Sequence, residues 1–231
     1  MEIDVNGISL HYEETGAGDV IIFLHGNGED HTIFSRTVDH FYGRYLCVSV
    51  DSRGHGLSGD GAERLTIPAL ADDIVRFIEK KELGGVTLIG FSDGGNVALE
   101  VAAVSDRVKN VVVIGANLYP KGMPFSVRFA MNLTRAVCLP FSFIPSVKRK
   151  RRLYYLMTHQ PEITAEKLSR ITARALVIAG THDNLIKTAH TEEIASKIPS
   201  AELRFIEGGG HFLFDTDLDQ LLMIIDEFMN P

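Results

Sequence analysis

The stretch Val86–Gly95 constrains the fold of this chain more than any other. Its β-branched apolar run stops at Gly90, and Ser92 follows two residues later between further glycines. This pattern predicts a strand, a very tight turn with Ser92 at its apex, and the start of a helix. Gly90, Gly94 and Gly95 allow the serine a strained backbone conformation and let strand and helix pass close together. We therefore expect the Ser92 hydroxyl to be presented above the sheet, although an ordinary glycine-rich turn is the alternative interpretation.

The length and charge of the chain limit the classes of protein to which it can belong. Its 231 residues suit a single domain, and no stretch has the composition of a linker. The net charge of −7 argues against nucleic acid as the main partner, since domains that bind phosphate backbones usually carry the opposite sign. The basic run Lys148–Arg152 goes the other way, and we interpret it as a solvated helix face.

Cysteine usage and apolar runs bear on the cellular compartment. The two cysteines form no disulfide or metal-binding pattern, which is typical of a reduced, cytoplasmic protein. The first residues lack the positive cluster and the apolar segment of a signal peptide. No run reaches the roughly 18 apolar residues that a membrane-spanning helix needs. We therefore expect a cytoplasmic protein without stable membrane association.

Strands and helices are expected to alternate along most of the chain. An antiparallel hairpin is predicted around Asn6–Gly7, a dipeptide that accepts the positive φ angles of a tight turn. Apolar runs predict further strands at 20–24, 45–50, 86–89, 108–114, 175–179 and 203–206. Helical patterns lie between some of them, at 34–41, 66–82 and 94–105. The sequence thus predicts an α/β fold with a mostly parallel sheet, an N-terminal antiparallel hairpin and helices on both faces.

A proline-rich segment interrupts this alternation between Asn117 and Thr164. Five prolines surround short apolar and basic stretches there. We interpret residues 117–164 as a small helical cap over the carboxyl ends of the strands, inserted into a single domain of residues 1–231. Its apolar residues, Phe125 and Phe129 among them, are candidates to line a substrate pocket, and packing of the cap onto the core is the alternative.

Five short motifs follow the predicted strands. They are His25–Gly28, Asp51–Ser58, Gly90–Gly94, Gly180–Asp183 and Gly208–Phe212. Each motif alone is weak to moderate, but together and in this order they resemble the α/β-hydrolase fold superfamily, and the resemblance covers nearly all of the chain except the cap. The resemblance implies the α/β-hydrolase fold and the chemistry of a serine hydrolase, which uses neither a metal nor an organic cofactor.

The candidate catalytic residues follow from what a serine nucleophile needs. A serine hydroxyl is a poor nucleophile at neutral pH, so it requires a general base, and the base requires an acid that orients it. Asp183 is the candidate acid, and in the order of residues that the resemblance implies only His190 and His211 follow it. His190 lies in a helix-forming stretch, whereas His211 lies in a loop after the last strand. We predict Ser92, His211 and Asp183 as the catalytic residues.

Acyl transfer also needs hydrogen-bond donors for the oxyanion of the tetrahedral intermediate. The family pattern assigns the backbone N–H groups of Asn27 and Asp93 to this role, and Gly26 and Gly28 let the chain turn at Asn27. The Asp93 side chain has two interpretations. Either hydrogen bonds hold it as a support for the serine turn, or it binds a cationic group of the substrate, as the resemblance to hydrolases of amino-acid esters implies.

Three polar residues near these motifs are interpreted as scaffold. We expect His25 to be buried and hydrogen-bonded, and Asp51 to pair with Arg53 and hold the loop after their strand. The run Gly54–Gly59 formally matches a dinucleotide-binding fingerprint, but Asp60-Gly61 shows that no helix begins directly after it. This context disfavours an NAD-dependent oxidoreductase.

The predicted function is hydrolysis of a carboxylic ester or related acyl bond of a small-molecule substrate, through an acyl-enzyme on Ser92. The same triad also serves thioesterases, carbon–carbon bond hydrolases and cofactor-free perhydrolases, and the sequence leaves these alternatives open. A non-catalytic hydrolase fold that binds a ligand is the alternative from another class. Such proteins usually lose a triad member, whereas this chain keeps all three candidates. The sequence does not fix the oligomeric state.

Overall fold

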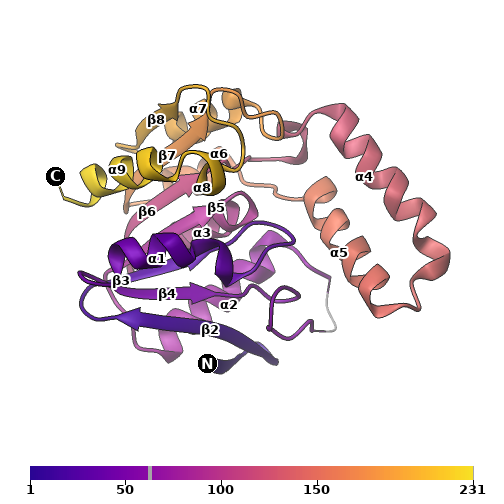
Figure 1. The fold of residues 1–231 in the computed structure, drawn as a ribbon, viewed down its shortest axis with the longest axis horizontal. Helices are drawn as coiled ribbons and strands as arrows, with labels where there is room; N and C mark the ends of the chain where they lie inside the picture. Colours follow the sequence, from indigo (N-terminus) through magenta and orange to yellow (C-terminus); the bar gives the residue numbers. More distant parts are fainter. Residues whose placement is uncertain (62–63, 231) are drawn as a thin grey trace.

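Eight strands form the centre of the part of the chain that the computed structural model describes, residues 1–61 and 64–230. They are β1 (Glu2–Val5), β2 (Ile8–Gly16), β3 (Val20–Leu24), β4 (Leu46–Val50), β5 (Val86–Phe91), β6 (Val108–Ile114), β7 (Arg174–Gly180) and β8 (Glu202–Ile206). All eight belong to one sheet, with the order β1-β2-β4-β3-β5-β6-β7-β8 (Figure 1). β2 pairs antiparallel with β1 and β4, and the other neighbours are parallel, which confirms the predicted fold class.

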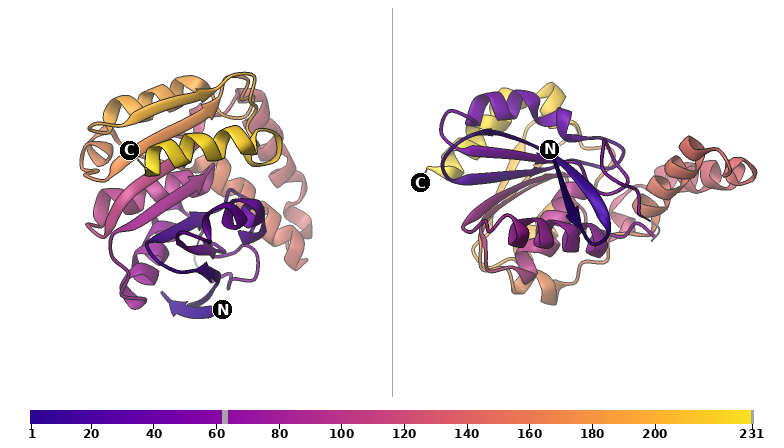
Figure 2. Two further views of the ribbon diagram at one scale, coloured as in Figure 1. Left: turned by 60° about the vertical axis from the view of Figure 1, so that its left-hand side comes forward. Right: turned by 90° about the horizontal axis from the view of Figure 1, so that it is seen from below.

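Helices lie on both faces of this sheet (Figures 1 and 2). The helices of the described residues, including those outside the two faces, are η1 (His31–Phe34), α1 (Ser35–Phe41), α2 (Ile67–Lys80), α3 (Asp93–Val104), η2 (Pro120–Gly122), α4 (Phe125–Val137), η3 (Leu139–Phe141), α5 (Pro145–His159), α6 (Ala165–Ser169), α7 (Thr188–Lys197), α8 (Leu213–Thr216) and α9 (Leu218–Met229). Thr66 caps α2: its side chain accepts a hydrogen bond from the Ala69 N–H. No helix of the described residues has the length and apolar character needed to cross a membrane.

The central strands are apolar on both faces because each face has its own helical layer. In β3, Ile22 and Leu24 belong to the core cluster that includes residues of α2, α3 and α7. Ile21 and Phe23 point the other way, into the cluster formed with α1 and α9. Successive side chains of a strand alternate between faces, so a strand buried on both sides needs a continuous apolar run. The same pattern made the strands predictable.

Helices α4 and α5 pack against each other and form an arm that projects from the sheet (Figure 2, right). Among the described residues, α4 buries none, whereas α5 buries Leu156 and Thr158 near its carboxyl end. Among the described residues of the arm, side chains are therefore buried only at this end of α5. The helical character expected between residues 117 and 164 is present, while the boundaries and the role of the segment as a cap stay predictions.

The basic run Lys148–Arg152 lies on α5 and is not simply a solvated face. Arg149 donates a hydrogen bond from Nε to the carbonyl oxygen of Gly54 at 2.9 Å, and Arg152 forms an ion pair with Asp60. Residues of the run also border a cleft of about 470 Å³ between the arm and the loop before α2. The predicted solvated face is present at Lys148, Arg149 and Lys150, which are exposed, but Arg149 and Arg152 also attach α5 to the loop that follows β4.

Candidate active site

Ser92 lies between β5 and α3 in a backbone conformation that L residues rarely adopt, with φ of 53° and ψ of −118°. Its N–H donates to the carbonyl oxygen of Ile114, at the end of β6, at 2.8 Å. A Cβ on Gly90 would lie 2.3 Å from the Gly94 carbonyl oxygen, and a Cβ on Gly94 would lie 2.0 Å from the Leu24 carbonyl oxygen. The predicted strand, tight turn and helix start are present, and they depend on glycine at both positions.

The three residues predicted as a triad form a chain in which His211 lies within hydrogen-bond distance of both Ser92 and Asp183. His211 Nε2 lies 3.2 Å from Ser92 Oγ, and His211 Nδ1 lies 2.7 Å from Asp183 Oδ2. The other carboxylate oxygen of Asp183 accepts the N–H groups of Leu185 and Ile186, both at 2.8 Å. With Nδ1–H donating to the buried carboxylate, Nε2 is free to accept the serine proton.

The loops that carry Asp183 and His211 are fastened to each other. The N–H of His182 donates to the carbonyl oxygen of Gly209 at 2.9 Å. A Cβ on Gly180 would lie only 2.1 Å from that same oxygen, so the two loops pass in direct backbone contact. The carbonyl oxygen of Gly209 therefore joins the loop that carries Asp183 to the loop that carries His211.

Two other histidines have structural contacts. His190 lies on α7, where its Nδ1 accepts the Leu118 N–H at 3.3 Å and its ring lies 4.5 Å from the Tyr119 ring. The structure does not bring it to Ser92. His25 is buried as predicted, and its Nε2 accepts the N–H of Ser52 at 3.1 Å. Burial lowers the pKa of both histidines, which favours neutral rings.

The residues predicted for the oxyanion are linked through their side chains. Asn27 Nδ2 donates to Asp93 Oδ2 at 3.0 Å, and Asn96 Nδ2 donates to Asp93 Oδ1 at 3.2 Å. Asp93 begins α3, so its backbone N–H has no acceptor within the helix. Burial raises the pKa of the Asp93 carboxyl above its ordinary value. Asn96 escaped the sequence reasoning, although its place one helical turn after Asp93 was a usable signal.

Two further residues border the site without having been singled out. Glu29 accepts the Gly26 N–H at 2.9 Å, and burial raises the pKa of Glu29 to about 6. A Cβ on Gly26 would meet both the Glu29 carboxylate, at 2.7 Å, and the Ser92 Cβ, at 3.2 Å. Gly115 has φ of 61°, and a Cβ there would lie 3.1 Å from the His211 ring. A glycine directly after a strand was the signal for Gly115, whereas nothing local marks Glu29.

A cavity of about 20 Å³ adjoins Ser92 and His211. Its other lining residues are Asp93, Asn117, Met123, Met157, Leu185 and Ile186. Phe125 and Phe129 do not line it: they stack on each other on α4, 73% and 57% exposed. The structure therefore differs from both expectations for these rings, a substrate pocket or packing onto the core, because α4 projects away from the sheet.

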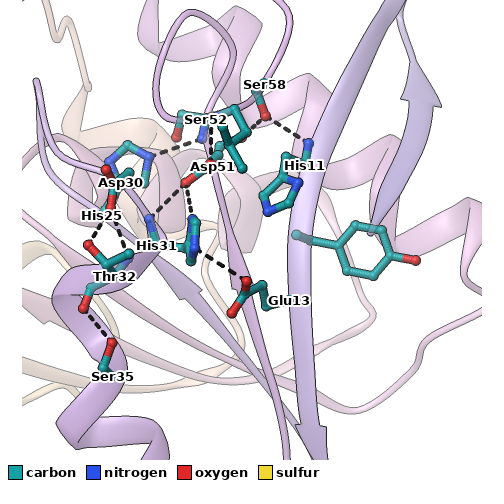
Figure 3. Close-up of polar contacts among 12 residues, drawn as sticks. His11, Glu13, His25, Asp30, His31, Thr32, Ser35, Asp51, Ser52 and Ser58 are labelled. Atoms are coloured by element: carbon teal, nitrogen blue, oxygen red, sulfur yellow. Dashed lines mark hydrogen bonds and ion pairs between the residues drawn. The ribbon is translucent and has the colours of Figure 1, made fainter.

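The predicted pair of Asp51 and Arg53 is wrong. Asp51 instead accepts the His31 N–H at 2.7 Å and the Leu57 N–H at 2.8 Å, and its carboxylate contacts His31 Nδ1 at 2.9 Å (Figure 3). Arg53 forms a buried ion pair with Asp73 on α2. Both residues still hold the loop after β4, but each does so through a partner from another segment.

Comparison with known proteins adds the family. A family model described as "Alpha/beta hydrolase family" matches residues 21–222. The chain is 26% identical over 253 residues to "Serine hydrolase BPHL" of Homo sapiens, covering 99% of this chain and 85% of the relative. It is 24% identical over 254 residues to "Pimeloyl-[acyl-carrier protein] methyl ester esterase" of Xanthomonas campestris pv. campestris (strain B100), covering 95% and 98%.

Among solved structures, the enol-lactonase from Burkholderia xenovorans LB400 is similar with a TM-score of 0.83 at 20% identity, covering 100% of both chains. This likeness concerns the fold. The family model, in contrast, spans most of the sequence and includes Ser92, Asp183 and His211. The chain therefore belongs to the α/β hydrolase family and is a hydrolase.

Proposed function

We propose that this protein hydrolyses carboxylic esters or related acyl bonds through an acyl-enzyme on Ser92. The observation that carries the proposal is the hydrogen-bonded chain from Ser92 Oγ through His211 to Asp183. His211 Nε2 accepts the serine proton while Oγ attacks the carbonyl carbon, and Asp183 stabilises the imidazolium that forms. His211 then donates this proton to the leaving group, and a water molecule that it deprotonates cleaves the acyl-enzyme.

The negative charge that develops on the carbonyl oxygen needs donors held in place beforehand. We assign this role to the backbone N–H groups of Asn27 and Asp93, the second of which lies at the positive end of α3. An ionised carboxylate beside this oxyanion would oppose catalysis. The hydrogen bonds from Asn27 and Asn96 to Asp93, and its raised pKa, support a structural role for that side chain.

The substrate range is proposed from the cavity beside Ser92. Its volume of about 20 Å³ is near that needed for one water molecule, so short acyl groups fit with the least rearrangement. Met123 and Met157 line the cavity, and their flexible side chains can move to admit longer groups. The names of the relatives, a methyl ester esterase and an enol-lactonase, support cleavage of a carbonyl–oxygen bond.

A fluorophosphonate probe and a substrate panel test this proposal. The probe is expected to label the wild-type protein and the Ser196→Ala control, an exposed serine on α7, but not Ser92→Ala. Ser92→Ala should also lower kcat by a factor on the order of 10⁶ while keeping the fold. Labelling or near wild-type turnover of Ser92→Ala would contradict the assignment. An inert wild-type protein would instead favour the non-catalytic, ligand-binding alternative.

The panel compares p-nitrophenyl esters from acetate to octanoate with a thioester, a vinylogous diketone and perhydrolysis by hydrogen peroxide. We expect kcat/KM to be highest for a short oxygen ester, because its acyl group displaces the fewest side chains from the cavity. A higher kcat/KM for the thioester, the diketone or hydrogen peroxide would contradict the proposed ester hydrolysis and would favour the corresponding reaction among those that the same triad supports.

A further inference from the structure

A group of metal-ligating side chains lies at β2 and the start of η1 (Figure 3). His11 and Glu13 are two residues apart on β2, so their side chains leave the same face of the strand. His31 begins η1, and its ring lies 5.2 Å from the His11 ring between centroids. One donor atom from each of these three residues lies within 4.8 Å of the other two. The sheet thus gathers two imidazoles and a carboxylate that are separate in sequence.

His11 carries the second, independent observation. Its Nε2 atom is buried and has no hydrogen-bond partner among the described residues. Buried polar atoms in native proteins nearly always have a partner, so an imidazole nitrogen without one needs an explanation. The backbone of His11 is fixed, because its N–H donates to Ser58 Oγ at 2.8 Å. The strand position that carries the His11 ring is therefore fixed beside Glu13 and His31.

His31 is oriented as a metal ligand would be. Its Nδ1 lies 2.9 Å from Asp51 Oδ1, and the Asp51 side chain is fully buried. When Nδ1–H donates to this carboxylate, the lone pair of a neutral ring lies on Nε2, which faces Glu13 Oε1 at 3.5 Å. A carboxylate that holds the second nitrogen of a histidine ligand is the usual outer partner of zinc sites.

The group is open to solvent on one side. A cavity of about 190 Å³ is lined by Glu13 and His31 together with Thr15, Ser35, Val38, Asp39, Cys47 and Ser49. It provides a path for an ion and room for a water molecule as a further ligand. No residue of this lining also lines the cavity beside Ser92. Occupation of the group can therefore be tested apart from hydrolysis.

We propose that His11 Nε2, His31 Nε2 and a Glu13 carboxylate oxygen bind one Zn²⁺ ion, with water in the fourth position. Two neutral imidazoles and one carboxylate are a donor set that zinc prefers. Glu13 is 61% exposed, so its side chain can move toward the histidines and shorten the distances to those of a bound ion. The ion ties β2 to η1, shortly after the Gly26–Gly28 loop, and takes no part in acyl transfer.

Titration calorimetry with Zn²⁺ on the full chain, purified with an affinity tag that lacks histidine, tests this site. We expect one equivalent to bind and the melting temperature to rise with zinc concentration. Glu13→Gln and His11→Gln should each weaken binding by at least about tenfold, the lower bound for losing even an outer partner of a metal ligand. His182→Gln, in an exposed loop, is the control and should bind as the wild type does.

Glu13→Gln keeps the test informative if His11→Gln fails to fold, since the Glu13 side chain is exposed. Co²⁺ in place of Zn²⁺ should give the visible absorption bands of a tetrahedral site, and both variants should lose them. Absence of binding, or equal binding by the wild type and Glu13→Gln, would overturn the proposal. Those results would mean that His31 simply contacts Asp51 and Glu13 without binding a metal ion.

Discussion

Replacing Glu29 with glutamine is expected to change how the stability of the protein depends on pH. Burial raises the pKa of Glu29 from its ordinary 4.5 to about 6, although the hydrogen bond from the Gly26 N–H lowers it. In the unfolded chain this pKa returns to its ordinary value, so between the two values the folded protein binds more protons. The contribution of protonated Glu29 to the free energy of unfolding is therefore fully present below the ordinary pKa of 4.5, and it is lost as the pH rises through about 6.

The size of this contribution follows from the two pKa values of Glu29. Their difference corresponds to about 2 kcal/mol of unfolding free energy at about 1.4 kcal/mol per pH unit. Because the side chain keeps some contact with solvent, which screens its charge, we expect about 1 kcal/mol. Glutamine can still accept the Gly26 N–H but does not titrate, so this part of the pH dependence is absent from the variant.

Urea unfolding of the wild type and Glu29→Gln at about pH 4.5 and about pH 7.5 measures the effect. The free energy of unfolding of the variant relative to the wild type should increase by about 1 kcal/mol from the lower to the higher pH. Groups that titrate alike in both proteins cancel in this difference. Glu192→Gln, an exposed glutamate on α7, serves as the control. A difference that stays constant or falls with pH would refute the reasoning.

Three further substitutions probe the site. Asp183→Asn should lower kcat by about 10⁴ without unfolding, because an amide no longer holds the required tautomer, whereas a comparable loss in His190→Gln would identify a different base. Gly94→Ala should destabilise the protein by about 3 kcal/mol or more in thermal unfolding, because the added Cβ would overlap the backbone of β3. Gly84→Ala is the control: no atom lies within 4 Å of the added Cβ, so the stability should not fall. Asp93→Asn should lower kcat/KM equally for an α-amino ester and its des-amino analogue, and a selective loss on the amino ester would mean that Asp93 binds the amino group.

The sheet and the proximity of Ser92, His211 and Asp183 could be predicted because local patterns determine them. Runs such as 20–24 and 108–114 are apolar on both faces, and Gly90 and Gly94 mark a turn that only small residues permit. Ser92, Asp183 and His211 follow strand ends, and the carboxyl ends of parallel strands share one edge of the sheet. The order of the strands in the sheet could not be predicted in this way, because no local pattern encodes which strands become neighbours.

Side-chain partners from distant segments could not be predicted. Asp51 and Arg53 lie two residues apart with opposite charges, which suggested a pair, but their side chains meet His31 and Asp73 instead. Local charge complementarity does not say which way a loop directs each side chain. The surroundings of the apolar rings on α4 could not be predicted for a related reason. A hydrophobic pattern shows that one face of a helix can be buried, but burial also requires another part of the protein to pack against that face, and α4 buries no residue.

In the proposed mechanism, the reacting side chains and the wall of the substrate cavity belong to different parts of this fold. Backbone contacts that tolerate no side chain fix Ser92 and the loops that carry Asp183 and His211: Gly94 against β3, and Gly180 against Gly209. Such contacts leave little freedom, which is how the strained backbone of Ser92 persists. The cavity wall, in contrast, includes Met157 on α5, a helix of the arm that projects from the sheet. We therefore expect changes in the arm to alter which acyl groups reach Ser92 while the distances among Ser92, His211 and Asp183 stay the same.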